Sequence, residues 1–285
     1  MRLLQFMQDG IPTLGIETET GIVKVAEAGK RLGIDVPKTM LEAIPGGETA
    51  KKALERLLTE KGTTEKLQYA PAVTGGEKIL CVGLNYHAHI RESKENIPSY
   101  PLLFSKFANA LSAHETCVRL SPEFTEYDYE AEMVIVIGKT AKDVPEERAG
   151  EYIFGYTCGN DLSNRETQLH RGGQWLIGKT MDGFAPLGPC VVTADSIDPS
   201  DLPIRSYVNG ELRQNGRTSQ MIFSCKKIVS YASHHMTLRA GDVIFTGTPA
   251  GVMLGYSESE KKWLCSGDLV EVEIGGIGVL RNRMI

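Results

Sequence analysis

Two acidic residues, Glu130 and Glu132, stand two positions apart in a segment, 127–138, whose composition favours a β-strand. Val and Ile crowd the second half of this segment, and Gly138 closes it. Because side chains alternate between the two faces of a strand, both carboxylates point the same way and repel each other. A shared hard cation such as Mg²⁺, Mn²⁺ or Ca²⁺ would remove this conflict, and a neighbouring Lys or Arg is the simpler alternative.

A third acidic residue follows another predicted strand. The segment 153–159 is largely apolar, and it is followed directly by Asn160 and Asp161. At the end of a strand, Asp161 could complete a set of oxygen ligands with Glu130 and Glu132. It suits equally well the N-cap of a helix predicted over 163–170.

An imidazole and a carboxylate share one face of a short predicted helix. The apolar segment 79–84 predicts a strand, and the polar segment after it holds His89 and Glu92 three positions apart. A carboxylate orients an imidazole and favours its protonated form, so this pair could take a proton from water and return it. A surface His beside a surface Glu is the alternative. The polar and proline-bearing segment 93–101 predicts a flap over the site.

Two lysines are candidates for the site. Lys106 ends a strand predicted over 101–106 and could meet a substrate carboxylate, and a solvated side chain is the simpler alternative for it. Lys179 lies in 178–189, a segment rich in turn formers that lacks the spacing of a phosphate-binding loop.

Three further polar residues could contact a substrate. Arg165 and Gln168 share a face of the predicted helix. The planar guanidinium of Arg suits a carboxylate, and the amide of Gln can bond a carbonyl or water. Thr248 lies in a Thr-Gly-Thr-Pro turn and could bond a substrate carboxylate, although an ordinary turn is the alternative.

Length and composition limit the class of protein. The 285 residues suffice for one large or two modest domains. A net charge of -5 and a pI near 5.8 argue against nucleic acid as a partner. We find no secretory signal and no apolar run that could span a bilayer, so we expect a cytoplasmic protein without a membrane partner. No C-x-x-C pair occurs, which argues against a zinc ribbon or thioredoxin motif.

The pattern of elements predicts an α+β, strand-rich protein in two parts. Residues 1–70 predict a small leading module, used for packing or dimer contact, and 71–285 predict the main domain. The boundary falls in the proline-containing segment 69–76. The module's strands are predicted over 3–7, 12–17 and 21–25, and its helix over 51–61. In the main domain, a helix is predicted over 221–234.

These motifs, taken in order, resemble the fumarylacetoacetate hydrolase family from about residue 78 to the end. Each motif is weak alone, and the ordered set is specific. The motifs are Gly83-Leu84-Asn85-Tyr86 with His89 and Glu92, Asp128-Tyr129-Glu130-Ala131-Glu132, Asn160-Asp161 with Arg165 and Gln168, Gly178-Lys179 with Asp182 and Pro186, and Gly241-Asp242 with Thr246-Gly247-Thr248-Pro249. Phe107 departs from the proline that many relatives carry after the lysine.

The resemblance implies a mixed β-sandwich roll with a small N-terminal α/β module, and a homodimer. It also implies a divalent ion, Mg²⁺ or Mn²⁺ with Ca²⁺ as a substitute in a crystal. This ion would be held by Glu130, Glu132 and Asp161.

For catalysis, the resemblance implies that His89 and Glu92 act as a dyad when the flap closes. Lys179 would be the third catalytic residue. The residues that would bind the oxo-acid end of the substrate are Lys106, Arg165, Gln168 and Thr248.

The activity expected first is hydrolysis of a C–C bond in a 2,4-dioxo acid of the acylpyruvate or fumarylpyruvate type, through a metal-stabilised pyruvate enolate. Oxaloacetate decarboxylation comes second, and isomerisation or hydration of 2-hydroxy-diene-dioates from aromatic catabolism third. All three reactions share a step in which the enzyme stabilises an enolate, so the sequence does not distinguish well between these activities. A metal-binding scaffold protein is the non-enzyme alternative, and it predicts no turnover of any 2-oxo acid.

Overall fold

Two β-sheets form the framework of the computed structural model, which describes residues 1–285. The larger sheet has ten strands in the order β3-β2-β1-β12-β10-β9-β15-β4-β5, and β6 pairs with β12 off this path. Its strands are β1 (Arg2–Gln8), β2 (Ile11–Thr18), β3 (Gly21–Lys24), β4 (Ile79–Gly83), β5 (Leu102–Lys106), β6 (Leu111–Ala113), β9 (Ala131–Ile137), β10 (Ile153–Asn160), β12 (Ala185–Thr193) and β15 (Val243–Phe245).

The smaller sheet has five strands in the order β14-β13-β16-β17-β7. They are β7 (Cys117–Val118), β13 (Pro203–Val208), β14 (Glu211–Arg217), β16 (Leu269–Ile274) and β17 (Gly278–Met284). A separate two-stranded pair joins β8 (Tyr127–Asp128) to β11 (Ser163–Asn164). The predicted strand-rich α+β class is therefore confirmed.

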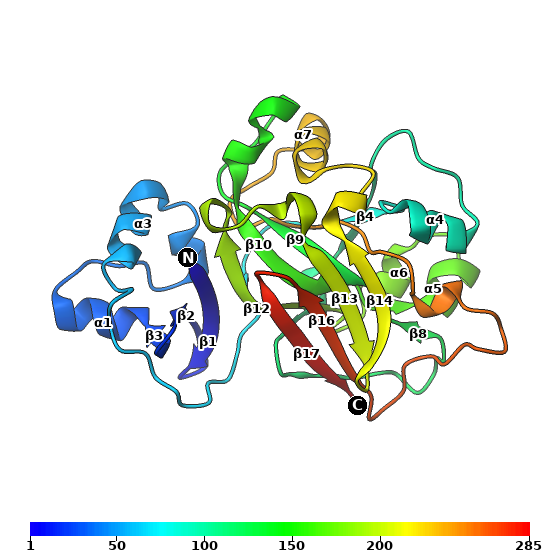
Figure 1. Ribbon diagram of the computed structural model, residues 1–285, viewed down its shortest axis with the longest axis horizontal. Helices are drawn as coiled ribbons and strands as arrows, with labels where there is room; N and C mark the ends of the chain where they lie inside the picture. Colours follow the sequence, from blue (N-terminus) through cyan, green and yellow to red (C-terminus); the bar gives the residue numbers. More distant parts are fainter.

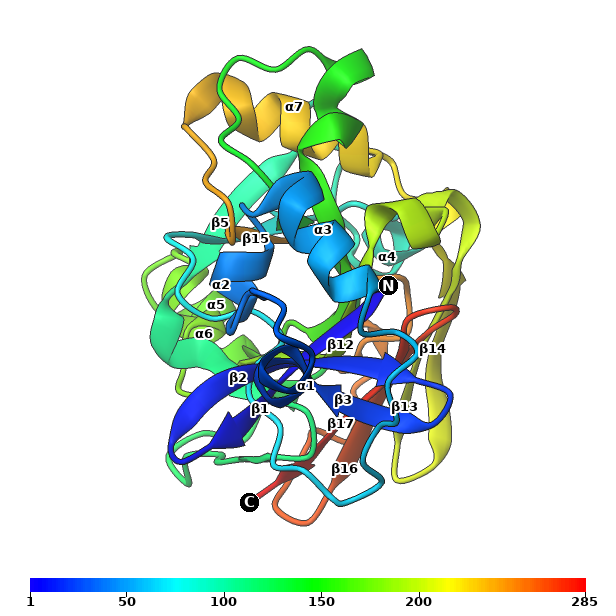
Figure 2. The same cartoon turned by 90° about the vertical axis from the view of Figure 1, so that its left-hand side faces the viewer.

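Short helices cover both ends of this framework. The α-helices are α1 (Val25–Leu32), α2 (Met40–Ala43), α3 (Gly47–Glu55), α4 (His87–Ser93), α5 (Arg165–His170), α6 (Leu176–Lys179) and α7 (Cys225–His235). The 3₁₀ helices are η1 (Ala108–Ala110), η2 (Glu146–Tyr152), η3 (Ala194–Ser196), η4 (Pro199–Asp201), η5 (Thr218–Gln220) and η6 (Met253–Gly255). Figure 1 shows α1 and α3 at one end of the molecule and α4 and α5 at the other, and Figure 2 views the first end directly. None of the helices is both long and apolar enough to cross a lipid bilayer.

The central strand β9 is buried along its whole length, on both faces. On one face, Met133, Ile135 and Ile137 join a core cluster with the smaller sheet and α7. On the other face, Val134 and Val136 pack in the cluster that includes β1, β2 and the first helices. Glu132 is two positions before Val134 and so shares this second face, which fixes the side of the sheet on which its carboxylate lies.

The strand predicted over 127–138 is interrupted at Tyr129 and Glu130. The carboxylate of Asp128 accepts the N–H of Tyr129 at 2.9 Å, and the side chain of Asn160 accepts the N–H of Glu130 at 3.0 Å. These side-chain bonds replace ladder bonds, and the chain changes partner from β11 to β10.

Three helices of the leading module differ from the prediction. No helix was predicted at α1, where Gly29 weakens the helical signal, or at α2, which has only four residues. A Cβ on Gly29 would lie 2.5 Å from Val36 Cγ2. The helix predicted over 51–61 is α3, which ends at Glu55 because the chain continues in tighter i→i+3 turns. β1 pairs with β12 and so extends the main sheet, and the division at residue 70 stays a prediction.

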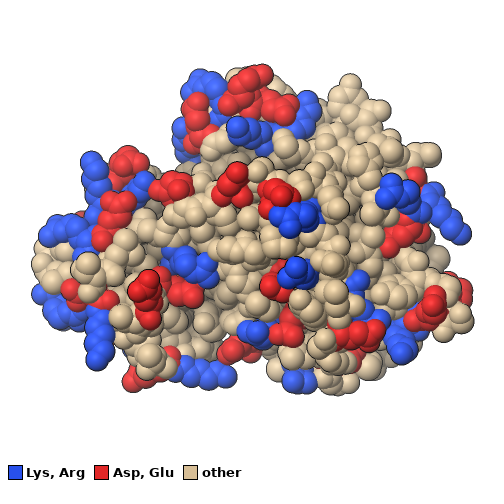
Figure 3. All heavy atoms as spheres, in the orientation of Figure 1, with Lys and Arg blue, Asp and Glu red and all other residues tan.

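Charged side chains are spread over the surface. Figure 3 shows acidic and basic residues interspersed on the visible face, without a large area of one sign. The predicted absence of a nucleic-acid partner remains untested.

His114 is a buried titratable group between the leading module and the smaller sheet. The residue is 6% exposed, its ring meets Tyr69 edge-on with centroids 4.7 Å apart, and its Nδ1 accepts the N–H of Arg281 at 3.1 Å. Burial lowers the pKa of His114 to about 4.

We expect this histidine to destabilise the fold at mildly acidic pH. The folded-state pKa lies below the unfolded value, so the unfolded chain takes up the proton first, and stability falls as pH drops through the unfolded pKa. The free energy of unfolding should fall by about 2 kcal/mol between about pH 7 and pH 5 on this account. Urea unfolding of His114→Asn should lack this loss, whereas the exposed His170→Asn should retain it. Equal pH slopes in all three proteins would contradict the assignment.

Candidate active site

The acidic residues predicted as metal ligands meet at the ends of β9 and β10. The antiparallel register pairs Gly159 with Glu132 and Asn160 with Ala131, which brings Asp161 beside both glutamates. Ligand oxygens of the three residues Glu130, Glu132 and Asp161 all lie within 4.8 Å of one another, and all three residues are buried. Asp161 is not the N-cap of α5, because Asn164 fills that position and accepts the N–H of Thr167.

Two of these carboxylates are paired with cations. Lys179 Nζ donates to Glu130 Oε2 and to Asp161 Oδ2, both at 2.9 Å, and Arg165 Nη2 lies 2.6 Å from Glu130 Oε1. Burial raises the pKa of Glu130, but Lys179 and Arg165 outweigh it and hold this pKa well below the ordinary value. Burial lowers the pKa of Lys179, but the negative charges of Asp161 and Glu130 outweigh this effect, so the pKa is raised above its ordinary value.

Glu132 has no cationic partner. Its Oε2 accepts the N–H of Gly247 at 2.7 Å. Burial, then the neighbouring Asp161 and Glu130, raise the pKa of Glu132 well above its ordinary value. A buried carboxylate without a cation is costly, so this position favours either a proton or a bound cation.

The residues present fit a divalent cation such as Mg²⁺ or Mn²⁺. The donors are all carboxylate oxygens, which are the ligands that hard cations prefer. Glu132 lacks a counter-charge, and Asp161 Oδ1 is buried without an aligned hydrogen bond. Since Lys179 already pairs with two of the three carboxylates, binding of an ion must redistribute these contacts.

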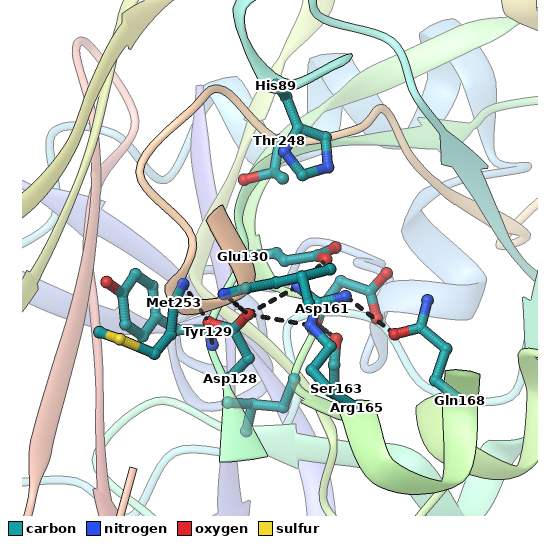
Figure 4. A network of polar contacts seen from close by, with 12 residues as sticks. His89, Asp128, Tyr129, Glu130, Asp161, Ser163, Arg165, Gln168, Thr248 and Met253 are labelled. Carbon is teal, nitrogen blue, oxygen red and sulfur yellow. Dashed lines mark hydrogen bonds and ion pairs between the residues drawn. The ribbon is translucent and has the colours of Figure 1, made fainter. Parts of the chain in front are cut away.

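The predicted dyad is formed on α4, above the carboxylates in Figure 4. His89 Nδ1 lies 2.8 Å from Glu92 Oε1, which leaves Nε2 of the ring for a reacting group. Asn85 anchors the chain just before the helix: its amide donates to the carbonyls of Phe223 and Thr246 at 3.1 and 2.7 Å.

A cavity of about 60 Å³ lies between the dyad and the carboxylates. The polar residues that line it are His89, Ser93, Glu95, Glu130, Glu132, Arg165, Gln168, Lys179 and Thr248. The apolar residues that line it are Val82, Leu84, Phe104, Leu169, Trp175 and Leu254. The polar groups can therefore hold a charged end of a small molecule, and the apolar groups reduce its exposure to water.

Lys106 does not occupy the position predicted for it and is not among the residues that line this cavity. Its ammonium group is fully buried, donates to Leu162 O at 2.9 Å and Phe184 O at 2.6 Å, and lies 2.6 Å from Asp161 Oδ1. Lys106 therefore holds Asp161, a predicted ligand, and does not face the cavity. The prediction that Lys106 ends a strand is confirmed, but its side chain points away from the position expected for a substrate contact.

Thr248 lines the cavity, but its hydroxyl is already used. It donates to Ala131 O at 2.9 Å and accepts from Gln214 Nε2 at 2.7 Å. Among the other predicted contacts, Gln168 Oε1 accepts from Arg165 Nη1 at 2.9 Å, which leaves the amide N–H groups of Gln168 for a ligand. The assigned roles in catalysis and substrate binding, like the homodimer, stay predictions.

The sequence reading assigned no role to two residues of the site. Trp175 forms part of the apolar wall and meets Phe104 edge-on, with ring centroids 5.4 Å apart. Asp128 is fully buried and bonds Arg165 and the backbone of η6. It stands within the acidic motif of the sequence, which was the available signal.

Comparison with known proteins identifies relatives of this chain. The model described as "Fumarylacetoacetate (FAA) hydrolase C-terminal" matches residues 78–285. The rat (Rattus norvegicus) protein named "Oxaloacetate tautomerase Fahd2a, mitochondrial" is 37% identical over 289 residues, covering 100% of this chain and 92% of its own. Its name places that relative in mitochondria, and this finding overturns the cytoplasmic location expected from the sequence.

Solved structures match over the whole chain. A fumarylacetoacetate hydrolase from psychrophilic Exiguobacterium antarcticum is 35% identical, with a TM-score of 0.85, and covers 100% of this chain and 99% of that one. A maleylpyruvate hydrolase from Sphingobium sp. SYK-6 is 29% identical, with a TM-score of 0.81, covering 100% and 99%. The predicted family fold is confirmed.

We expect Glu132→Gln to separate metal binding from folding. The amide keeps an acceptor for Gly247 N–H and removes a buried charge that has no partner, so the ion-free variant should be at least as stable as the parent. Mn²⁺ should raise the melting temperature of the parent and not that of the variant, and titration calorimetry should show affinity reduced by at least about tenfold. The exposed Glu123→Gln is the control, and equal Mn²⁺ stabilisation of all three proteins would refute the ligand assignment.

Proposed function

Since this chain belongs to the fumarylacetoacetate hydrolase family, we propose that it is an enzyme that interconverts the keto and enol forms of oxaloacetate. The rat relative supports this reading, because it is similar over the full length of the chain and is named an oxaloacetate tautomerase. Hydrolysis of a 2,4-dioxo acid, which the sequence placed first, becomes the second candidate.

The observation that carries the proposal is that a base and an enolate-stabilising group face one cavity. His89, which Glu92 orients, and Lys179 both line it. Nε2 of His89 would take the proton from the carbon beside the keto group, and Lys179 would donate a hydrogen bond to the oxygen where negative charge develops. Return of the proton to that oxygen completes the conversion to the enol.

The other polar residues would bind and orient the substrate. Gln168 presents free amide N–H groups, and Arg165 stands beside it with its guanidinium bonded to Glu130. When bound to the carboxylates, a divalent ion would polarise the keto group as a Lewis acid. The apolar wall around Trp175 would keep competing water away from the developing charge.

C–C bond hydrolysis is the second candidate, and the dyad is the observation that favours it. A histidine oriented by a carboxylate could activate water, and the chain is similar to a maleylpyruvate hydrolase. Oxaloacetate decarboxylation would use the same enolate stabilisation without that water.

Turnover measurements on three substrates distinguish these reactions. With Mg²⁺ or Mn²⁺ present, we expect the enol absorbance of oxaloacetate to relax faster than without enzyme, and pyruvate to form much more slowly. His89→Ala should lose at least about 100-fold in this rate while keeping its Mn²⁺ affinity, since the base is not a ligand. His87→Ala, an exposed residue of the same helix, is the control.

Other outcomes would reject the tautomerase proposal. Pyruvate formation as fast as enol relaxation would identify a decarboxylase. Preferred turnover of maleylpyruvate or acetylpyruvate would identify a hydrolase, and no turnover of any 2-oxo acid would leave the scaffold alternative.

A further inference from the structure

Asp128 is connected both to the carboxylate cluster, through Arg165, and to the His89–Glu92 dyad, through the backbone of residues 251–255. It is completely buried, and Figure 4 shows it between Arg165 and Met253. Its Oδ2 accepts from Arg165 Nε at 2.9 Å and from the N–H of Leu254 at 3.0 Å. Its Oδ1 accepts the N–H groups of Met253 at 2.8 Å and of Tyr129 at 2.9 Å. A carboxylate with this many donors is held in one orientation.

Through Arg165, Asp128 reaches the predicted metal ligands. The same guanidinium that bonds Asp128 lies 2.6 Å from Glu130 Oε1. Arg165 thus fixes the position of Glu130 relative to Asp128.

Through residues 251–255, which we call the seat loop, Asp128 reaches the dyad. Gly251 N–H donates to Glu92 Oε2 at 2.9 Å, and Tyr129 Oη donates to Gly251 O at 3.0 Å. Gly255 lies directly against the same carboxylate: a Cβ there would be 2.7 Å from both Cδ and Oε2 of Glu92. The loop therefore offers Glu92 one hydrogen-bond donor and a space that only glycine leaves open.

The helix that carries the dyad needs such support. α4 has only seven residues. Non-glycine residues in the left-handed region stand on both sides of it: Leu84 with φ 55° and Lys94 with φ 56°. A helix this short is marginal by itself, so contacts outside it must fix the direction of Glu92. The seat loop supplies these contacts.

From these contacts we propose that Asp128 is a positioning residue that sets the spacing between the dyad and the carboxylate cluster. Asp128 bonds the backbone of the seat loop, which in turn bonds Glu92. It also bonds Arg165, which in turn pairs with Glu130. The inference rests on the proposed function in one respect, since it takes His89 as the base.

Gly255→Ala tests the dyad side. The atoms that a new methyl group meets are the far end of a flexible side chain, so the Glu92 carboxylate should move while the fold is retained. We expect kcat to fall by about 10- to 100-fold with KM within about twofold, because the base loses its orientation and the substrate contacts remain. In a Glu92→Ala background the same methyl has nothing to displace, and it should cost less than about twofold. Gly150→Ala, whose Cβ would be 3.3 Å from Cε of the exposed Lys226, is the matched control.

Asp128→Asn tests the connection between the two sides. An amide keeps one acceptor but loses the charge that pairs with Arg165, so both halves should loosen. We expect Mn²⁺ affinity to fall by roughly 10- to 100-fold, in contrast with Gly255→Ala, which should keep it. Amide hydrogen exchange should rise in residues 87–93 in both variants, and in the seat loop in Asp128→Asn.

Three results would overturn the inference: equal loss of kcat from Gly255→Ala with and without Glu92, unchanged exchange in residues 87–93, or unchanged Mn²⁺ affinity in Asp128→Asn. Exchange and metal affinity do not depend on turnover. If both change as expected while no 2-oxo acid is converted, the proposed function fails and the positioning role stands.

Discussion

The site depends on the burial of more acid than base in one cluster. The acidic members are Asp128, Glu130, Glu132 and Asp161, and the basic members are Lys106, Arg165 and Lys179, all of them buried. Every carboxylate except Glu132 lies in an ion pair, so the cluster carries one excess negative charge whenever Glu132 is ionised. Buried charge of this kind is tolerated only when it is compensated. The strands around it therefore have to hold the groups in positions that a further positive charge can satisfy.

The fold meets this demand with a strand that is buried on both faces. β9 packs against the smaller sheet on one side and against the leading module on the other, so it has little freedom to shift. Its pairing with β10 determines which acidic residues meet at its beginning. The break at Tyr129 turns the chain so that Asp128 bonds η6, and one short segment thereby supplies both a predicted metal ligand and the residue that braces Arg165.

Local spacing was enough to predict that Glu130 lies beside Glu132 and His89 beside Glu92, while their roles as metal ligands and catalytic dyad stay predictions. Glu130 and Glu132 are two positions apart, and His89 and Glu92 are three apart, so strand and helix periodicity alone place each pair on one face. The direction and the partners of the Lys106 side chain could not be predicted in this way. Its position at a strand end was clear, but its partners Leu162 and Phe184 are 56 and 78 residues away in the chain. Asp128 and Met253, 125 residues apart, illustrate the same limit, because their bond depends on a tertiary arrangement that no local spacing encodes.

The excess charge also explains why such a site suits enolate chemistry. A divalent ion would leave the cluster with one positive charge, which the carboxylate of a 2-oxo acid would match. Forming an enolate then places new negative charge in a cavity with an apolar wall, where it is costly unless a positive charge forms at the same moment. In the proposed reaction, His89 would gain that positive charge when it takes the proton, and Glu92, at 2.8 Å, would stabilise it. The net charge of the enclosed site is then unchanged during the reaction. This balance holds only while His89 stays close to the carboxylate cluster, which is why a shift of the Glu92 carboxylate by one added methyl group at Gly255 should reduce the rate more than it reduces the stability of the fold.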